Sequence, residues 1–374
     1  MSNAYSRAGV DVAAGDQAVE LMKASVRATL GPEVLAGLGG FAGLWDASAL
    51  KNYRSPVLAT STDGVGTKLA IAQAMDIHET VGFDLVGMVV DDLVVSGAKP
   101  LFMTDYIATG KVDPAKVAAV VSGIAAACAA TGTALIGGET AEHPGVMRAD
   151  EYDIAGAAVG VVERDDLLGA HRVAEGDVVL GLASSGLHSN GYSLVRAVVD
   201  DLGWDYARPI EAFGRTLGEE LLEPTRLYTK SVLKLVGSAG GGVHGIAHVT
   251  GGGLAANLAR VLPPHLGAVV SRAAWPVPPV FHLLHDAAHV AWEDLERTLN
   301  LGVGMAVIVG DAALESALAT LAEAGEQAVP IGRVALVKDV GAEADQRGVP
   351  AADLVSQAKG VTGGPVLLID QYRA

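Results

Sequence analysis

Apolar positions along the chain alternate between helical periods and short continuous runs, a pattern typical of a mixed α/β fold. The predicted elements of the first half are helices over 16–29 and 80–96 and strands over 56–62, 101–109, 133–136 and 153–162. A further helix is predicted from Pro114, because Asp113 can cap its first turn and proline favours the first helical position. Gly132 can end this helix in a left-handed conformation.

The second half repeats the alternation. Its predicted elements are strands over 177–183, 244–249 and 302–309 and helices from Tyr192, Thr225, Leu254 and Asp311. The polar stretch 163–166 and the turn-like Gly169 separate the halves, so we expect two related α/β domains, residues 1–168 and 169–374. The pattern weakens over 337–364, before a final strand-like run, and we interpret that part as an appended surface segment.

Residues 117–138 carry no charged side chain over about the length of a membrane span. The stretch is rich in alanine and is interrupted by serine, glycine and threonine. Val117, Val120, Ile124 and Cys128 recur at helical spacing. We therefore expect a buried helix that leads into a buried strand, and no membrane partner.

The charge balance narrows the classes of function. The chain has 43 acidic and 26 basic residues among 374, a net charge of -17. Such a surface repels a phosphate backbone, which disfavours nucleic-acid binding, whereas a small anion can still be held by backbone dipoles or metal ions. The single cysteine, Cys128, cannot form an intramolecular disulfide, and residues 1–10 lack the apolar core of a secretion signal. Both features indicate a cytoplasmic protein.

The most informative motif is Asp-Gly-Val-Gly-Thr-Lys at 63–68, between a predicted strand and a helix. Its glycines let backbone amides approach a phosphate, and a helix N-terminus favours negative charge. Lys68 can neutralise a terminal phosphoryl group, and Asp63 can hold magnesium. The spacing is not that of a Walker A loop. The alternative is an ordinary strand-to-helix turn with a solvated lysine.

Two further acidic motifs stand out. Asp91 and Asp92 interrupt an apolar helix, where an unpaired charge is costly, so they either face solvent or bind a cation. Glu139 follows two glycines in a predicted loop after the strand at 133–136. Together, Asp63, Asp92 and Glu139 suit a magnesium-bound polyphosphate. Taken singly, each is better explained as an ordinary loop carboxylate.

The predicted loop 184–191 offers hydroxyls, an amide and backbone donors to a phosphate or sugar. Within it, His188 is the only side chain that titrates near neutral pH, and hence a candidate acid, base or hydrogen-bond donor. The alternative is helix capping by Ser189 or Asn190, with His188 merely exposed. The glycine-rich loop 250–253 repeats the anion-binding design before another helix.

Taken in order, these motifs resemble the phosphoribosylformylglycinamidine cyclo-ligases, also called aminoimidazole ribonucleotide synthetases. The matching stretches are 8–11, 63–68, 92–94, 105–111, 137–142, 144–145, 185–196, 223–226, 248–253 and 297–305. The resemblance covers Tyr5 to about Val334. The chain departs from it at Asp91, where many members have asparagine, and at Ser6 and Arg7, where a lysine and an acid are frequent.

The resemblance implies a two-domain protomer that forms a homodimer through its first domains, with an active site in the cleft between the halves. It implies ATP, magnesium and potassium as cofactors. The implied reaction is the ATP-dependent closure of formylglycinamidine ribonucleotide to aminoimidazole ribonucleotide, a step of de novo purine biosynthesis. Phosphorylation of the formyl amide oxygen would turn a poor leaving group into phosphate.

The expected site residues follow from the motifs and the resemblance together. The catalytic candidates are His188 and Lys68. The expected magnesium ligands are Asp63, Asp92 and Glu139. The expected ATP-binding residues are Asp11, Gly64, Gly66, Thr67, Lys68, Gly137, Gly138 and Thr140. The expected substrate-binding residues are Ser185, His188, Ser189, Asn190, Gly251 and Gly252.

Two alternatives remain open at this point. One is another ATP-using member of the same superfamily, such as a thiamine-monophosphate kinase, although that kinase lacks the combination of loops 185–191 and 250–253. The other is a catalytically silent nucleotide-binding scaffold. The acids, Lys68 and His188 occur together, which favours catalysis, since a scaffold needs only its packing residues.

Overall fold

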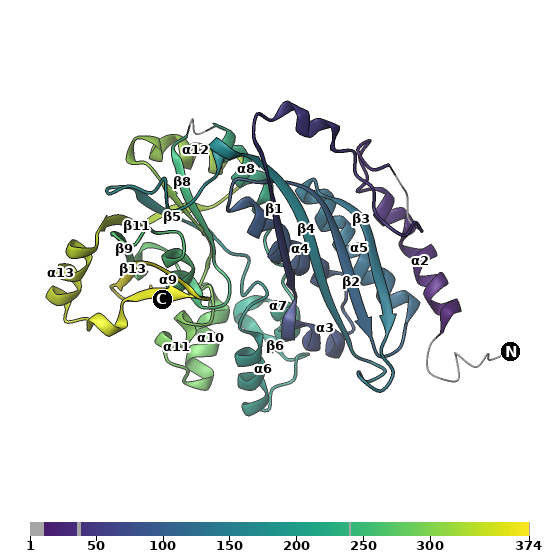
Figure 1. Ribbon diagram of the computed structural model, residues 1–374. Helices are drawn as coiled ribbons and strands as arrows, with labels where there is room; N and C mark the ends of the chain where they lie inside the picture. Colours follow the sequence, from purple (N-terminus) through teal and green to yellow (C-terminus); the bar gives the residue numbers. More distant parts are fainter. Residues whose placement is uncertain (1–10, 36–38, 239–240, 374) are drawn as a thin grey trace.

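The computed structural model of the chain describes residues 11–35, 39–238 and 241–373. The motif residues before Asp11 lie outside the described part. Two α/β units stand side by side, one built on a four-stranded sheet and the other on a seven-stranded sheet (Figure 1). The expected mixed α/β class is confirmed.

The first sheet has the strand order β1-β4-β2-β3. Its strands are β1 (Pro56–Gly64), β2 (Lys99–Thr109), β3 (Ala134–Glu142) and β4 (Tyr152–Glu163). All four were predicted, but β3 is longer than expected, and the proposed loop 137–142 is wrong. Those residues continue the strand because they pair in parallel with 104–109 of β2.

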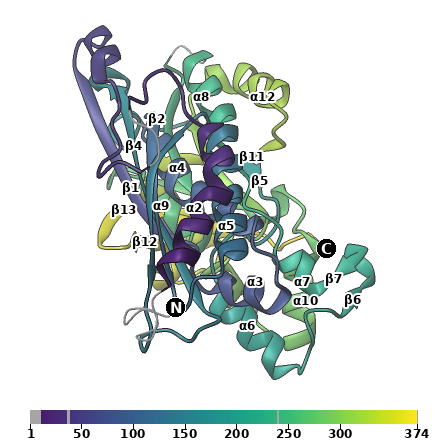
Figure 2. The ribbon, with the colours of Figure 1, turned by 90° about the vertical axis from the view of Figure 1, so that its right-hand side faces the viewer.

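The helices of the first unit lie on one side of its sheet (Figure 2). They are α2 (Val12–Arg27), α3 (Leu69–Met75), α4 (Thr80–Val94) and α5 (Pro114–Thr131). Asp113 caps α5 through its side chain, and Gly132 ends it at a φ of 76°, as the sequence predicts. By length and composition α5 could cross a membrane, but half of that stretch is buried within the described fold. Its buried residues face α2 and α4, so the predicted buried helix is confirmed.

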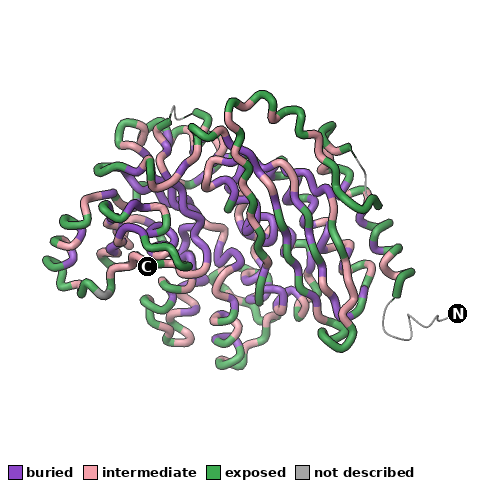
Figure 3. The backbone as a smooth tube through the Cα atoms, viewed as in Figure 1, coloured by how far each residue is buried: buried purple, intermediate pink, exposed green. Residues whose placement is uncertain are grey.

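The other side of the first sheet is open. Burial alternates along β1, and exposed positions follow one another across the sheet (Figure 3). Leu58 is 60% exposed and Tyr106 is 42% exposed on this side. The sheet therefore presents apolar side chains that the rest of the described chain does not cover.

The second sheet has the order β12-β13-β9-β11-β5-β10-β8. Its strands are β5 (Val178–Ala183), β8 (Val243–His248), β9 (Leu266–Ser271), β10 (Val303–Val309), β11 (Ala328–Leu336), β12 (Val355–Ala358) and β13 (Val361–Ile369). A small hairpin pairs β6 (Pro209–Ile210) with β7 (Arg215–Thr216). The helices are α6 (Tyr192–Asp201), α7 (Leu217–Leu221), α8 (Thr229–Ser238), α9 (Gly253–Ala259), α10 (Pro279–Ala288), α11 (Trp292–Glu296), α12 (Leu314–Glu323) and α13 (Val337–Arg347).

The interpretation of 337–364 as an appended surface segment is wrong. This part forms α13 and β12 and begins β13, which pairs in parallel with β9 inside the main sheet. Val340 and Leu367 are buried together against the sheet. The sequence signal is weak because α13 buries only a narrow stripe and is otherwise polar.

The helix predicted from Thr225 begins four residues later, at Thr229. The backbone amides of Thr225 and Tyr228 donate hydrogen bonds to carboxylates of α4, which hold this segment outside the helix. This segment forms part of the junction between the two units.

Candidate active site

Two buried carboxylates of α4 bind the second unit. Asp84 and Asp91 are seven residues apart, two turns of helix, and therefore share one face. Asp84 accepts hydrogen bonds from the amide and the hydroxyl of Thr225, at 3.0 and 2.6 Å. Asp91 accepts from the amide of Tyr228 at 3.0 Å and the hydroxyl of Thr229 at 2.6 Å. These bonds fix the start of α8.

The expectation that Asp91 faces solvent or binds a cation is wrong. Its side chain is fully buried and bound to backbone and hydroxyl donors. Burial raises the pKa of Asp91 to about 6. Asp91 thus joins the two units, and only its neighbour Asp92 remains half-exposed.

Lys68 is fully buried in the same junction. Its Nζ donates to Asp84 Oδ1 at 2.8 Å, to the carbonyl of His188 at 2.9 Å and to the carbonyl of Glu223 at 2.7 Å. An ammonium group has three donors, so all are satisfied by protein acceptors. In this structure Lys68 is therefore not solvated, and its donors are taken by protein acceptors. Its predicted ATP contact stays a prediction. Burial lowers the pKa of Lys68, and Asp84 opposes that shift.

The predicted glycine turn is present after β1. Gly64 ends the strand, Gly66 takes a φ of 74°, and a short 3-10 turn leads into α3. The hydroxyl of Thr67 lies 3.2 Å from that of Ser193 in the second unit. The order of strand, glycine turn and helix is confirmed, and the turn contacts the second unit.

The structure brings the predicted substrate loop to this turn. Ser189 donates to the carbonyl of Val65 at 2.8 Å, and Ser185 donates to the carbonyl of Pro224 at 2.6 Å. Asn190 accepts from the amide of Gly251 at 2.9 Å. The two glycine-containing loops of the second unit therefore meet where the units join.

Gly252 lies slightly apart from this meeting point. It takes a φ of 101° at the start of α9 and lines a cavity of about 360 Å³. Arg272 and Arg297 line the same cavity.

His188 is buried and occupies the left-handed region at a φ of 62°. Its Nε2 accepts from the amide of Ser185 at 3.2 Å, so the ring proton resides on Nδ1. Among the described residues, Nδ1 has no hydrogen-bond partner. Burial lowers the pKa of His188 well below its usual range. The idea that His188 titrates near neutral pH is wrong here; it is a neutral donor.

The three expected magnesium ligands do not meet at one point. Asp63 and Glu139 stand on β1 and β3, three strand spacings or about 14 Å apart at the backbone. The carboxylate of Asp92 instead lies 2.9 Å from Nδ1 of His248. Within the described ranges, no three acidic, histidine or cysteine side chains are grouped closely enough for one ion. The structure thus contains no preassembled three-carboxylate site.

A cavity of about 610 Å³ lies between α2 and β3 and gathers one part of the predicted ATP site. The predicted residues that line it are Asp11, Gly137, Gly138, Glu139 and Thr140. Asp16, Asp105 and Glu142 add three more carboxyl groups. Its described lining includes no lysine or arginine. An unaccompanied polyphosphate would be repelled here.

Asp105 was not singled out as a site residue, although its motif was. It faces the buried side of β2, between the apolar Met103 and Ile107. Its Oδ1 is 2.0 Å from the position that a Cβ of Gly138 would occupy, so a larger residue there would displace the Asp105 side chain. Burial raises the pKa of Asp105 to about 7. The sequence signal that could have identified Asp105 is a charged residue at an apolar position of a predicted strand.

Glu142 was also missed. Its two oxygens accept from the amides of Asp11 and Val112. It therefore ties the start of α2 to the turn after β2, at the rim of the cavity.

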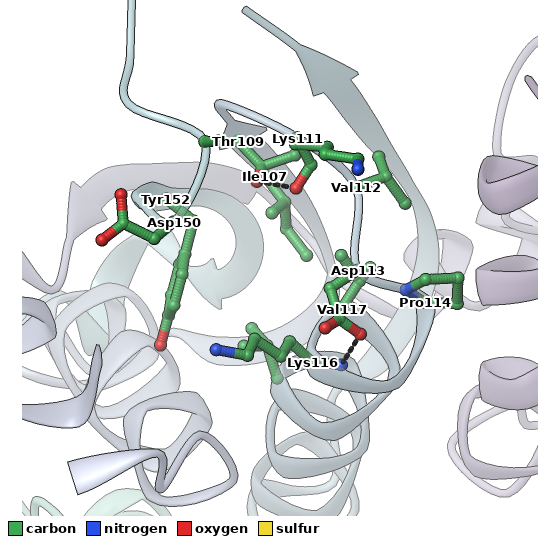
Figure 4. Close-up of a pocket in the computed structure, with 12 residues that line it drawn as sticks. Ile107, Thr109, Lys111, Val112, Asp113, Pro114, Lys116, Val117, Asp150 and Tyr152 are labelled. Carbon is green, nitrogen blue, oxygen red and sulfur yellow. Dashed lines mark hydrogen bonds between the residues drawn. The ribbon is translucent and has the colours of Figure 1, made fainter. Parts of the chain in front are cut away.

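A separate groove of about 480 Å³ contains none of the predicted site residues (Figure 4). It has an apolar floor that includes Ile107 and Val117, with Lys111 and Lys116 at its rim. The ammonium of Lys116 is 3.0 Å from Asp76. Lys116 is thus balanced by a nearby acid.

Comparison with known families assigns both units. Residues 45–162 match the family model "AIR synthase related protein, N-terminal domain". Residues 174–345 match "AIR synthase related protein, C-terminal domain".

Individual relatives agree with the family models. The chain is 49% identical over 335 residues to the phosphoribosylformylglycinamidine cyclo-ligase of Bacillus pumilus (strain SAFR-032), covering 89% of this chain and 96% of that protein. It is 50% identical over 337 residues to the protein of that name from Geobacillus sp. (strain WCH70), with the same coverage.

Solved structures share the fold at low identity. Thiamine-monophosphate kinase from Stenotrophomonas maltophilia K279a has a TM-score of 0.63 at 20% identity, covering 95% of this chain and 97% of that chain. Hydrogenase maturation protein HypE in complex with ATP has a TM-score of 0.62 at 19% identity, covering 96% and 95%. At this identity the likeness concerns the fold alone.

Asp105→Asn is expected to flatten the pH dependence of stability. An aspartate in the unfolded chain loses its proton near pH ~3.9, whereas folded Asp105 has a pKa of about 7. Between these values only the folded state keeps the proton. The free energy of unfolding of the wild-type protein therefore falls as the pH rises, by about 1.4 kcal/mol per unit of pKa difference.

Urea unfolding at about pH 5 and about pH 8 measures this effect. The wild-type protein should lose more stability between the two conditions than the Asp105→Asn variant. Equal losses in both proteins would show that Asp105 ionises normally in the folded state.

Proposed function

The chain belongs to the family of AIR synthase related proteins that includes the phosphoribosylformylglycinamidine cyclo-ligases, and we propose that it closes formylglycinamidine ribonucleotide to aminoimidazole ribonucleotide at the expense of ATP. This is a ligase reaction of purine biosynthesis. The observation that carries the proposal is the acid-lined cavity between α2 and β3, which suits a nucleotide that arrives with magnesium.

The reaction has two bond exchanges. The formyl amide oxygen attacks the γ-phosphorus of ATP, so an O–P bond forms while the bond to ADP breaks. The amidine nitrogen then attacks the activated carbon, a C–N bond forms, and the oxygen leaves with phosphate. The products are aminoimidazole ribonucleotide, ADP, phosphate and a proton. The protein must chiefly position the reactants and neutralise charge.

The cavity fits magnesium by its donor set. Five carboxyl groups line it, no basic residue of the described chain does so, and burial holds Asp105 partly protonated. Magnesium uses one or two carboxylates together with phosphate oxygens and would neutralise the polyphosphate. Asp63 and Glu139 therefore need not share one ion. We assign Asp63, Asp92 and Glu139 to magnesium as a proposal, although of the three only Glu139 lines this cavity. Potassium is proposed from the family resemblance alone.

The ribonucleotide is proposed to bind at the junction of the units. The support is the convergence of Ser185, His188, Asn190 and Gly251 there. The Nδ1–H group of His188 has no hydrogen-bond partner among the described residues. It would donate a hydrogen bond to the substrate. We place the domain boundary at 168/169 and the protein in the cytoplasm, where its single cysteine stays reduced.

Purified protein with formylglycinamidine ribonucleotide, ATP and magnesium is expected to produce aminoimidazole ribonucleotide and ADP in equal amounts. Glu139→Gln should lower kcat/KM for ATP by about 10- to 100-fold, because a charge-assisted contact is worth about 1.5–3 kcal/mol. Glu315→Gln, an exposed change on α12, is the matched control. ATP binding without any product would instead support the silent scaffold, and ATP-dependent phosphorylation of another acceptor would support a different superfamily activity.

The open face of the first sheet supports the proposed homodimer. Its exposed middle consists of Leu58, Thr60, Thr104, Tyr106, Ala155 and Ala157. None of these side chains carries a charge, and a contiguous exposed patch of this kind marks an interaction surface. A second copy of the chain would cover it.

Leu58→Lys is expected to convert the dimer into a monomer, because each interface would bury an unpaired charge from both copies. Sedimentation velocity measures the change. Val329→Lys, at an exposed apolar position of the second unit, should leave the mass unchanged. A wild-type protein that sediments as a monomer would contradict the proposed dimer.

A further inference from the structure

Three contacts join the predicted nucleotide motif 63–68 to the substrate loop and to the helix α6 that follows it. Lys68 donates to the carbonyl of His188, Ser189 donates to the carbonyl of Val65, and the hydroxyls of Thr67 and Ser193 lie 3.2 Å apart. The turn belongs to the first unit and the loop to the second. The contacts therefore cross the junction between the two units.

Lys68 is the central member of this set. It contacts α4 through Asp84, the substrate loop through His188, and the segment after α7 through the carbonyl of Glu223. Asp84 is itself anchored by both polar groups of Thr225. The side chains of Lys68 and Asp84 have no exposed surface, so water cannot replace these contacts.

The contact with His188 acts on a strained backbone. A φ of 62° is uncommon for a residue other than glycine and persists only where neighbouring contacts hold it. The Lys68 ammonium binds the carbonyl of that same residue. Together with the bond from the Ser185 amide to the ring, it holds the backbone and side chain of His188 in this arrangement.

We propose that Lys68 is a positioning residue that holds the His188–Asn190 loop in place and couples the binding of ATP to the binding of the ribonucleotide. The proposal rests on the proposed function. Lys68 directly follows the turn 64–67, whose Gly64, Gly66 and Thr67 the sequence predicts as contacts of the ATP phosphates. Binding of a phosphate to that turn would fix the position of the Lys68 side chain, and Lys68 would in turn fix the position of the loop. Coupling of this kind is reciprocal, so each ligand tightens the binding of the other.

The test uses Lys68→Met together with Asp84→Asn, because the double variant leaves no unpaired charge in the junction. Thermal unfolding first establishes that it folds. Lys116→Met, which changes a surface lysine of the groove in Figure 4, is the matched control. The affinity of a non-hydrolysable ATP analogue with magnesium is then measured with and without formylglycinamidine ribonucleotide.

In the wild-type protein the ribonucleotide should tighten analogue binding within the roughly 5- to 150-fold range typical of coupled sites. The folded double variant should keep the analogue affinity of the free protein but lose this enhancement. Its kcat should fall and its KM for the ribonucleotide should rise. Unchanged coupling, or a loss confined to analogue affinity, would overturn the positioning role and restore Lys68 as a phosphate ligand.

The binding measurement separates this inference from the proposed function. If the wild-type protein binds both ligands cooperatively but forms no product, the proposed reaction fails while the coupling stands. If the wild-type protein forms product but binds the two ligands independently, the reaction stands and the coupling is overturned.

Discussion

A lysine and an aspartate without exposed side-chain surface, Lys68 and Asp84, meet where the two α/β units join. Removing one partner of a buried pair typically costs about 3–5 kcal/mol, because the other charge is left without water or a counter-charge. The pair is supported by Thr225 on one side and by the carbonyls of His188 and Glu223 on the other. The geometry of the junction thus depends on charges that have no alternative partners in solvent.

Charged side chains have two different arrangements in the two main parts of the site. At the junction, basic and acidic groups satisfy one another and fix loops in place. In the cavity between α2 and β3, carboxyl groups gather without a basic partner among the described lining residues. The first arrangement is suited to positioning, and the second leaves a need for positive charge that, in the proposed function, magnesium would supply with the nucleotide. An acidic protein can bind ATP in this way despite its net charge of -17.

Much of the fold was predictable because local patterns agree with it. The cap at Asp113, the left-handed Gly132 and the glycine turn after β1 have local causes that can be read from the sequence. The errors arose where a distant partner decides the outcome. From the sequence, Lys68 and Asp91 resembled ligand-binding charges. Their actual partners, Asp84 for Lys68 and Tyr228 and Thr229 for Asp91, are distant in sequence and could not be identified from it. Residues 137–142 resembled a loop in the sequence, but they form a strand because they pair with β2.

The most direct test of this account is a crystal structure with a non-hydrolysable ATP analogue and magnesium. The account predicts phosphates and metal among the carboxylates of the first unit, with Lys68 still bound to Asp84 and to the carbonyl of His188. A Lys68 ammonium that has left Asp84 and contacts the terminal phosphate would contradict it.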